Sequence, residues 1–375
     1  MRTPLSLRAL LLPLVPLYRL ALAARELRLR WGFEPVRRLR YPVIAIGNLS
    51  TGGSGKTPLT IALAKALAQR GFQVDVLSRG YGRQSRLPAR VHPDGTAEEF
   101  GDEPLLIARE TGLPVYVAKQ RYDAGLLAES KGTGFSPHTN PANDAGLLVE
   151  SKGTGFSPYI NPANVEGALA PEGNGRTVHL LDDGFQHRQL ARDIDIALLN
   201  RHDWHDHLLP AGNLREPLKS IRRATVLAIP ADDPRFESEL RAWGWQGPIW
   251  RIKRTMDVPA IAGPVVAFCG IARPHQFFHG LESAGLTLAA RKAFPDHHRY
   301  TAADLDELKT SALAAKASAL LTTEKDFVRL AKLTAALPSS LPLIAARLHI
   351  EIENESTAID WLVSSIGPAH PRPPL

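Results

Sequence analysis

Short apolar runs alternate with helix-like patterns along most of the chain from residue 43 onward. Residues 43–46 form a β-branched apolar run, and residues 59–67 follow with apolar side chains at helical spacing. Such alternation is typical of strand–helix units that build a parallel sheet. Further apolar runs, each expected to be a strand, lie at residues 73–77, 114–118, 177–181, 194–199 and 224–229. The pattern therefore predicts an α/β fold with a mostly parallel sheet.

The same alternation restarts after a short extended stretch at residues 249–258. We expect strands at 264–270 and 286–289, a helix at 274–283, a helix that begins with the capping-box-like Thr301-Ala-Ala-Asp304, and a strand followed by a polar loop over 319–326. The chain is then predicted to form two α/β/α sandwich domains, 25–248 and 259–345, joined by the extended linker 249–258. A return strand, a terminal helix and a loose tail would occupy 346–375.

The N-terminus is apolar but interrupted. Residues 5–24 carry two arginines and two prolines, and a collar of arginines follows directly (Arg25, Arg28, Arg30, Arg37, Arg38 and Arg40). A spanning helix needs about 20 mostly uncharged residues, a length this stretch barely reaches. A basic collar beside apolar residues suits anionic lipid headgroups. We favour a membrane-associated helix at 1–24 that lies on the surface, over a helix packed on the protein itself or a cleaved secretory signal.

Residues 123–143 recur almost unchanged as residues 144–164. Two near-identical copies indicate a tandem duplication, because a solenoid would need at least three units. The surrounding residues 128–175 are rich in Gly, Pro, Ser and Asn, which predicts a surface excursion that is mostly loop. The duplicated insert at 123–164 is therefore expected to leave the chemistry unaffected.

Composition narrows the class of protein and of partner. The 375 residues are 44% apolar and 22% charged, which is ordinary for a globular protein. A net charge of +7 favours acidic partners such as nucleic acid, anionic lipid or a phosphorylated substrate. The only cysteine, Cys269, excludes an intramolecular disulfide and fits a reducing cytosol.

One stretch carries a specific chemistry: Gly47-Asn-Leu-Ser-Thr-Gly-Gly-Ser-Gly-Lys-Thr-Pro58, between the first predicted strand and the first helix. A glycine-rich turn that leads into a helix forms a phosphate cradle of backbone N–H groups, here expected from Gly52, Gly53, Ser54 and Gly55. Lys56 would reach the phosphates of ATP and Thr57 would hold Mg²⁺. The general pattern has glycine where this chain has Ser50.

Other candidate residues follow later strands. Asp182 and Asp183 end the run 177–181 and suit a second magnesium-holding element. Ser78, Arg79 and Tyr81 follow the run 73–77, where loops of an open α/β sheet meet ligands. Asp102 lies near a helix start, so capping is its simplest role. The His- and Asp-rich residues 201–207 are read as a solvated loop in preference to a metal site.

Six motifs in this order resemble the tetraacyldisaccharide 4'-kinase family. They are the phosphate loop, Ser78-Arg-Gly-Tyr81, Gly101-Asp-Glu-Pro104, Asp182-Asp-Gly-Phe-Gln-His187, the pair Leu209-Pro-Ala-Gly212 and Leu214-Arg-Glu-Pro-Leu218, and Phe294-Pro-Asp-His297. The resemblance covers residues 43 to about 326 apart from the insert, and Ser50 fits the family's form of the loop. It implies ATP-dependent phosphorylation of the 4'-hydroxyl of a membrane-embedded tetraacyl disaccharide 1-phosphate.

The resemblance also implies roles for single residues. Asp102 with His297 would be the base system for the sugar hydroxyl, and Arg215 would stabilise the transferring phosphate. Lys56 and Thr57 would serve the phosphates and Mg²⁺, with Asp182 and Asp183 on the metal side. Tyr81 and its loop would meet the glycolipid. Because sugar hydroxyls are weak nucleophiles, positioning and charge neutralisation should dominate the reaction.

An alternative of another class stays open from the sequence. A membrane-docked nucleotide switch or partition-type ATPase would also use the loop, the acidic strand end and the basic N-terminus. A nucleic-acid-dependent ATPase is weaker, because the arginines cluster beside an apolar segment and lack interleaved aromatic residues. We expect a glycolipid substrate, an anionic membrane surface at the cytoplasmic face of the bacterial inner membrane, no nucleic acid, and a monomer.

Overall fold

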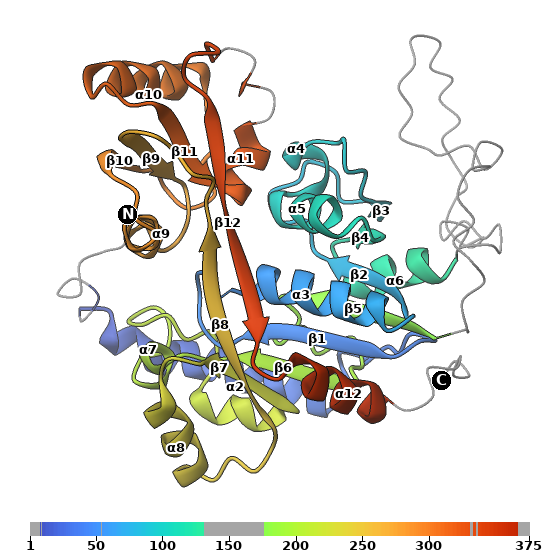
Figure 1. The fold of residues 1–375 in the computed structure, drawn as a ribbon. Coiled ribbons are helices and arrows are strands. Elements are labelled where there is room, and N and C mark those ends of the chain that lie inside the picture. Colours follow the sequence, from blue (N-terminus) through green and yellow to red (C-terminus); the bar gives the residue numbers. More distant parts are fainter. Residues whose placement is uncertain are drawn as a thin grey trace, which may run out of the picture.

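Twelve strands form one sheet within the part of the chain that the computed structural model describes, namely residue 8 and residues 10–53, 55–130, 176–330, 333–334 and 337–366. The strand order is β10-β9-β11-β12-β8-β7-β6-β1-β5-β2-β4-β3 (Figure 1). The strands are β1 Val43–Asn48, β2 Gln73–Ser78, β3 Ala89–Arg90, β4 Val115–Val117, β5 Thr177–Asp182, β6 Ile194–Leu198, β7 Val226–Pro230, β8 Ile249–Asp257, β9 Val265–Cys269, β10 Leu288–Ala293, β11 Ala319–Thr323 and β12 Leu343–Ile352. The predicted α/β class with a mostly parallel sheet is confirmed.

The position of β1 decides where a ligand can bind. It pairs in parallel with β5 on one side and with β6 on the other, while β2 and β4 continue beyond β5 and β7 beyond β6. The strand order therefore reverses next to β1, and ligands of open α/β sheets bind outside the carboxyl ends of strands at such a reversal. The carboxyl ends of β1 and β5 are brought together there, with Ile46 opposite Asp182.

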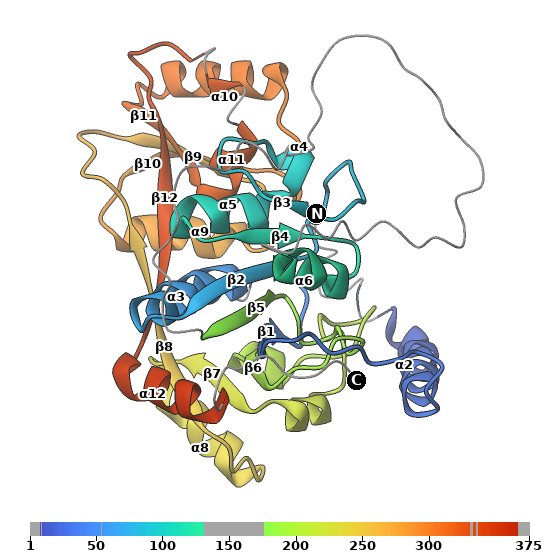
Figure 2. The ribbon, with the colours of Figure 1, turned by 90° about the vertical axis from the view of Figure 1, so that its right-hand side faces the viewer.

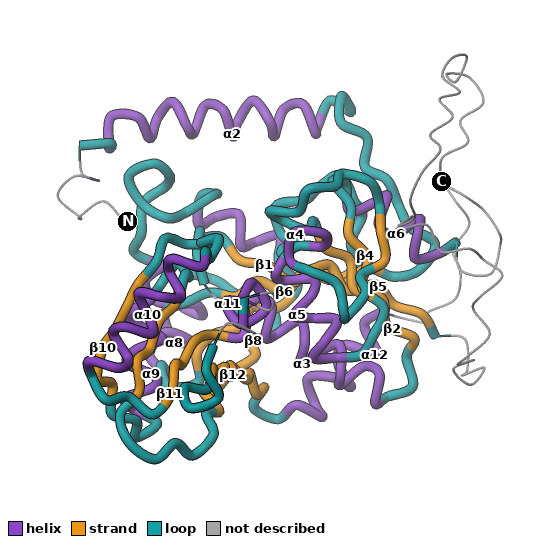
Figure 3. Tube along the Cα trace, turned by 90° about the horizontal axis from the view of Figure 1, so that it is seen from above, coloured by secondary structure: helices purple, strands orange, loops and turns teal. Residues whose placement is uncertain are grey.

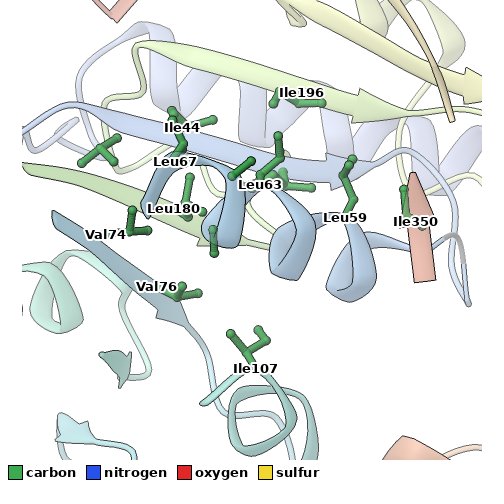
Figure 4. Close-up of a cluster of buried hydrophobic side chains, with 14 of the residues drawn as sticks. Ile44, Leu59, Leu63, Leu67, Val74, Val76, Ile107, Leu180, Ile196 and Ile350 are labelled. Atoms are coloured by element: carbon green, nitrogen blue, oxygen red, sulfur yellow. The ribbon is translucent and has the colours of Figure 1, made fainter. Parts of the chain in front are cut away.

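Helices cover the sheet between the strands. They are α2 Val15–Arg30, α3 Lys56–Gln69, α4 Ala97–Phe100, α5 Asp102–Thr111, α6 Arg121–Glu129, α7 Arg201–Trp204, α8 Pro234–Ala242, α9 Pro274–Ser283, α10 Ala302–Ala314, α11 Glu324–Leu330 and α12 Glu355–Ile366, with 3₁₀ turns at Leu12–Leu14 and Leu218–Arg223. Figure 4 shows Leu59, Leu63 and Leu67 of α3 against the side chains of β1 and β5. This apolar stripe fixes α3, and with it the phosphate loop, on the sheet.

The two longest strands connect the halves of the molecule. β8 pairs in parallel with β7 and antiparallel with β12, which in turn pairs with β11. Figures 1 and 2 show β8 and β12 running from the lower group of strands to the upper group of β9, β10 and β11. The stretch 249–258, predicted as a linker, thus lies almost wholly in a strand of the shared sheet. The division into separate domains stays a prediction.

Several local predictions need correction. The polar loop expected after residue 323 is the helix α11, and it begins where Asp326 accepts a hydrogen bond from the Thr323 hydroxyl at 2.7 Å. The solvated loop expected at 201–207 contains the short helix α7, whose start is capped by Asn200. In both places side-chain caps stabilise a helix that the apolar pattern does not reveal. Helix α3 begins at Lys56, two residues before Pro58, its predicted start.

The N-terminal helix α2 has two different faces. Val15, Tyr18 and Leu22 pack against the apolar cluster beneath β6 and β7, whereas Leu17 and Leu20 are 67% and 66% exposed. The helix lies along one side of the molecule in Figure 3 and extends to Arg30, beyond the boundary predicted at 24. Within the described residues no helix is both long enough and apolar enough to cross a bilayer. Packing on the protein, the less favoured alternative, therefore holds for one face of α2.

Three predictions lie outside the described residues: the position of Ser54, most of the duplicated insert, and the tail at 367–375. Only the first residues of the insert, from Asp123 to Ser130, belong to the described part, and they form most of α6.

Candidate active site

The phosphate loop joins the end of β1 to the start of α3. Gly52 and Gly55 adopt φ angles of 92° and 91°, a region that favours glycine because it lacks a Cβ. Gly55 is also crowded, since a Cβ there would lie 3.1 Å from Ile350 Cδ1 of β12. Larger residues would distort the turn that aims the first N–H groups of α3 outward. The sequence thus places glycine where the backbone requires it.

Ser50 and Asn48 account for the unusual letter in the loop. Both side chains are fully buried, and the Asn48 amide donates to Ser50 Oγ at 3.1 Å. The side-chain oxygen of Asn48, Oδ1, accepts a hydrogen bond from Lys56 Nζ at 3.1 Å. A serine at position 50 therefore holds the amide that orients Lys56, a role that glycine lacks. Sequence reasoning missed Asn48, whose only signal is its place at the end of the first strand.

Asp182 and Asp183 differ although they are neighbours. Burial, together with the charges of Glu103 and Asp183, raises the pKa of Asp182 to about 7. Burial also opposes ionisation of Asp183, but Lys56 and Arg215 outweigh it and lower the pKa of that carboxyl to about 2. Lys56 Nζ lies 3.4 Å from Asp183 and Arg215 Nη1 lies 3.1 Å from it. The carboxylate of Asp183 thus sits between two cations that phosphate oxygens could also attract.

Two of the three residues predicted for Mg²⁺, Thr57 and Asp182, suit that ion, whereas Asp183 is paired with Lys56 and Arg215. Thr57 opens α3 with only 3% of its surface exposed, and Asp182 accepts a hydrogen bond from Thr60 at 3.0 Å. Burial and then the charges of Glu103 and Asp183 disfavour the ionised form of Asp182, and a bound divalent cation would favour that form. No group of three or more His, Cys, Asp or Glu side chains in the described part of the chain could hold a metal alone. Mg²⁺ would accordingly need the oxygens of a nucleotide as additional ligands.

The second group of residues centres on Asp102, at the first position of α5. Its side chain makes no helix cap, so the simplest expected role is wrong. Its Oδ2 lies 3.3 Å from His297 Nδ1 and 3.1 Å from Arg329 Nε of α11. Burial would raise the pKa of Asp102, but the bond with His297 and the charge of Arg329 hold it well below its usual value. The hydrogen bond to Asp102 raises the pKa of His297.

His297 itself sits in an unusual conformation. Its φ is 58°, which costs free energy in a residue with a Cβ and tends to occur at functional sites. Its backbone N–H donates to the Gly270 carbonyl at 3.1 Å, so the turn after β10 is tied to the end of β9. The fold therefore holds this imidazole against Asp102.

A cavity opens beside this pair and is lined by residues from both halves, among them Tyr81, Asp102, His297 and Arg329. The ring of Tyr81 is 61% exposed and lies 5.1 Å from the imidazole of His297. Of the other residues predicted to meet the substrate, Arg79 is exposed and Ser78 is buried at the end of β2.

A lysine that the sequence reading left unassigned links the two groups. Lys325 of α11 bonds to Glu103 at 2.5 Å, and the negative charges of Glu103, Asp102 and Asp182 raise its pKa against the effect of burial. The two helices that carry these residues, α5 and α11, lie side by side in Figures 1 and 2. The phosphate-binding group and the Asp102–His297 pair are thus neighbours in one electrostatic field.

Comparisons with known proteins agree over nearly the whole chain. A family model described as tetraacyldisaccharide-1-P 4'-kinase matches residues 7–366. A tetraacyldisaccharide 4'-kinase of Koribacter versatilis is 38% identical over 365 residues, which are 94% of this chain and 98% of that protein. One of Chromobacterium violaceum is 36% identical over 340 residues, with 87% and 85% covered. The crystal structure of LpxK from Aquifex aeolicus in complex with ATP aligns with a TM-score of 0.66 and 30% identity, covering 96% of this chain and 99% of that one.

Proposed function

The chain belongs to the tetraacyldisaccharide-1-phosphate 4'-kinase family, and we propose that the residues described above transfer the γ-phosphate of ATP to the 4'-hydroxyl of a tetraacyl disaccharide 1-phosphate. The phosphate loop and Lys56 bind the triphosphate. Thr57 and Asp182 hold Mg²⁺, which when bound neutralises charge on the phosphate oxygens. Asp183 orients Lys56 and Arg215, the two cations nearest the transferring group.

The acceptor hydroxyl enters the cavity beside Asp102 and His297. Its proton passes to the Asp102–His297 pair while its oxygen forms a bond to the γ-phosphorus. The bond from that phosphorus to the oxygen bridging the β- and γ-phosphates breaks, and ADP leaves. A late proton transfer suits this pair, because phosphoryl transfer is dominated by positioning and charge stabilisation.

One observation carries the proposal: two chemically different groups lie next to each other. Lys56, Asp182, Asp183 and Arg215 form an anion- and metal-binding set, while Asp102 and His297 form a proton-accepting pair. Lys325, which pairs with Glu103, acts by its charge on Asp102 of the second group and on Asp182 of the first. A nucleotide switch that only hydrolyses ATP has no need for an aspartate–histidine pair in a cavity that reaches the surface.

A transfer assay tests the reaction directly. Purified protein is incubated with γ-labelled ATP, Mg²⁺ and tetraacyl disaccharide 1-phosphate in mixed micelles, and label is followed into the glycolipid. We expect acceptor-dependent formation of labelled product and of equimolar ADP. ADP release at the same rate without the acceptor, and no labelled lipid, would favour the ATPase alternative.

The protein is proposed to work as a monomer on the cytoplasmic face of the bacterial inner membrane, with no nucleic-acid partner. The support is the outer face of α2, where Leu17 and Leu20 are exposed beside the 3₁₀ turn that exposes Leu12 and Leu14. Trp31 and Phe33, just after the helix, are 66% and 71% exposed. Exposed apolar and aromatic residues next to arginines are typical of helices that lie in a lipid interface.

Sedimentation with vesicles tests this placement. Substituting Leu17 and Leu20 by serine should weaken binding to vesicles containing phosphatidylglycerol, since two apolar side chains no longer enter the lipid. The matched control is Leu313→Ser on α10, a leucine that is 77% exposed but lies in the other half of the chain. Equal vesicle binding by the wild type, the Leu17 and Leu20 double variant and Leu313→Ser would contradict membrane docking through α2. It would leave the assignment of the reaction unchanged.

A further inference from the structure

Helix α11 carries an arginine that the reaction above does not use. Arg329 contacts Asp102 through both Nε, at 3.1 Å, and Nη2. Its Nη1 donates to Asp326 Oδ1 at 2.7 Å and to the Gly270 carbonyl at 3.0 Å. Only 8% of the side chain is exposed, so the guanidinium is enclosed by these partners. A planar guanidinium that contacts a carboxylate through two nitrogens holds that carboxylate in one orientation.

The anchor for Arg329 is itself fixed. Asp326 is fully buried, and its second oxygen accepts hydrogen bonds from the Gly270 N–H at 3.0 Å and from the Thr323 hydroxyl at 2.7 Å. Gly270 is also the residue whose carbonyl accepts from the backbone of His297. The chain of contacts therefore runs from Asp326 through Arg329 to Asp102, and Gly270 ties the same chain to His297.

Arg329 also faces the ring nitrogen that pairs with Asp102. Its Nη2 lies 3.1 Å from His297 Nδ1, while Asp102 Oδ2 lies 3.3 Å from that atom. Arginine only donates, so a hydrogen bond from Nη2 to Nδ1 would require Nδ1 to lack a proton. Nη2 and Nε both donate to Asp102 instead, and the ionised carboxylate can then accept the proton that Nδ1 carries. Only the neutral form with its proton on Nδ1 has a free lone pair on Nε2, so only in that form can Nε2 accept a proton.

We propose that Arg329 is the positioning residue for the base pair: it holds the Asp102 carboxylate in place and ionised, so that His297 carries its proton on Nδ1 and accepts the substrate proton at Nε2. This inference rests on the proposed reaction, but it concerns which atom is the base. Arg329 acts through Asp102 and His297 and does not contact the reacting atoms.

The charges around His297 set the sign of the expected pH effect. Asp102 of α5 and Asp296 of the same turn favour its protonated form, whereas Arg329 of α11 disfavours it. Removing the arginine leaves the two carboxylates unopposed. The pKa of His297 should therefore rise, and the acidic limb of the pH–rate profile should move to higher pH.

Two variants test the proposal. Arg329→Met removes the charge and the fork, and should lower kcat by about 10²-fold with little change in KM for the glycolipid, together with the shift of the acidic limb. Arg329→Lys keeps the charge but cannot reach all its partners, so kcat should fall while the acidic limb stays near its original pH. Arg291→Met, an exposed arginine of β10 paired with Glu282, is the control and should change neither.

A spectroscopic measurement separates this inference from the reaction itself. Long-range ¹H–¹⁵N correlation spectra of ligand-free protein report the tautomer and titration of His297, assigned by its loss in His297→Gln. In the wild type we expect the proton on Nδ1, and in Arg329→Met a mixture of tautomers and a higher midpoint. Identical spectra and midpoints in the two proteins would overturn the proposal, whether or not phosphate transfer occurs. If Arg329→Met does not fold, the same comparison with Arg329→Lys, where only the tautomer should change, decides.

Discussion

The two sides of the site are assembled in different ways. The nucleotide side uses Asn48, Lys56 and Thr57 from one strand–loop–helix unit, and adds Asp182 and Asp183 from the strand paired with β1. The acceptor side joins Asp102 to Arg329 across 227 residues and to His297 in a turn after β10. One side is therefore set by local backbone and one strand ladder, whereas the other depends on how two halves of the chain pack together.

This difference indicates which side tolerates change. A phosphate loop keeps its geometry as long as β1 and α3 stay in place, because its donors belong to the backbone. The acceptor side needs α5, α11 and the turn at His297 to meet, so a displacement of α11 moves Arg329 and Lys325 together. Substitutions on the two sides should accordingly separate nucleotide binding from proton transfer.

The largest effect is expected for Lys56→Met. Loss of the ammonium removes a charge from the phosphates and leaves Asp183 with one cation fewer, so kcat should fall by about 10³-fold and ATP binding should weaken. Steady-state kinetics and calorimetric titration of ATP measure both. Asn48→Ala, which keeps the lysine but removes its carbonyl partner, should cost about 10-fold. If Asn48→Ala lowers kcat and ATP affinity as much as Lys56→Met does, the whole loop has lost its structure. That result would contradict the view that the nucleotide side is fixed by its local backbone.

The next effect concerns the acceptor side. Asp102→Ala and His297→Ala should each lower kcat by about 10²-fold, as removal of a general base often does. The double variant should lose little more, because residues that act as one unit give non-additive losses. ATP affinity measured by titration should stay within about twofold of wild type in all three, since the hydrogen bonds and ion pairs of the two residues do not involve the described part of the phosphate loop. A matching loss of ATP affinity would show that the two sides are not separable.

The sequence was most informative where function depends on neighbours along the chain. Three features could be predicted because each follows from a local pattern: the phosphate loop, Asp182 and Asp183 at a strand end, and the capping box at Thr301. In the structure the loop lies between β1 and α3, Asp182 ends β5 with Asp183 directly after it, and Thr301 caps α10. The α/β class followed from the alternation of apolar runs. The roles of the site residues stay predictions for the experiments above.

The residues missed from the sequence share a different origin. Lys325 belongs to the stretch predicted as a polar loop and Arg329 follows it, because the first turn of α11 is polar and shows no apolar period. Their partners, Glu103 and Asp102, lie more than 200 residues earlier, and no local pattern pairs them. Asp102 and His297 were connected only through resemblance to a family. The sequence did not predict that β8 and β12 continue the sheet, because two strands so far apart in the chain show no local pattern that identifies them as partners.

The neighbours Asp182 and Asp183 give a smaller, opposite pair of effects on stability. With its folded pKa raised to about 7, Asp182 is penalised for ionising, so the unliganded protein loses stability as pH rises from about 4 to 7. Asp182→Asn keeps an oxygen for the Thr60 hydroxyl and removes this penalty. It should therefore stabilise the metal-free protein at pH 8 by about 1 to 4 kcal/mol and abolish activity.

Asp183→Asn is the matched comparison. The folded pKa of Asp183 is lowered to about 2, so its ionised form stabilises the fold above about pH 4, and this contribution is lost as pH falls toward 2. The asparagine should destabilise the protein at pH 8 by about 1 to 2 kcal/mol, because Lys56 and Arg215 lose their shared carboxylate. Chemical denaturation in chelator at pH 8 and pH 4 measures both. Effects of the same sign would contradict the assignment of Asp182 to the metal and Asp183 to the cations.

The smallest expected effect tests how far the acceptor side depends on its surroundings. Thr301 caps α10 by accepting from the Asp304 N–H and donating to the Asp304 carboxylate, which also lies 3.1 Å from His298, the neighbour of His297. Thr301→Ala should cost about 1 kcal/mol, and Thr310→Ala, at an exposed position later in the same helix, should cost nothing or slightly stabilise the fold. Thermal unfolding compares the two. If the cap is only local, kcat stays within twofold of wild type. A larger fall confined to Thr301→Ala would mean that the start of α10 also holds the His297 turn, and would extend the long-range assembly of the acceptor side by one more helix.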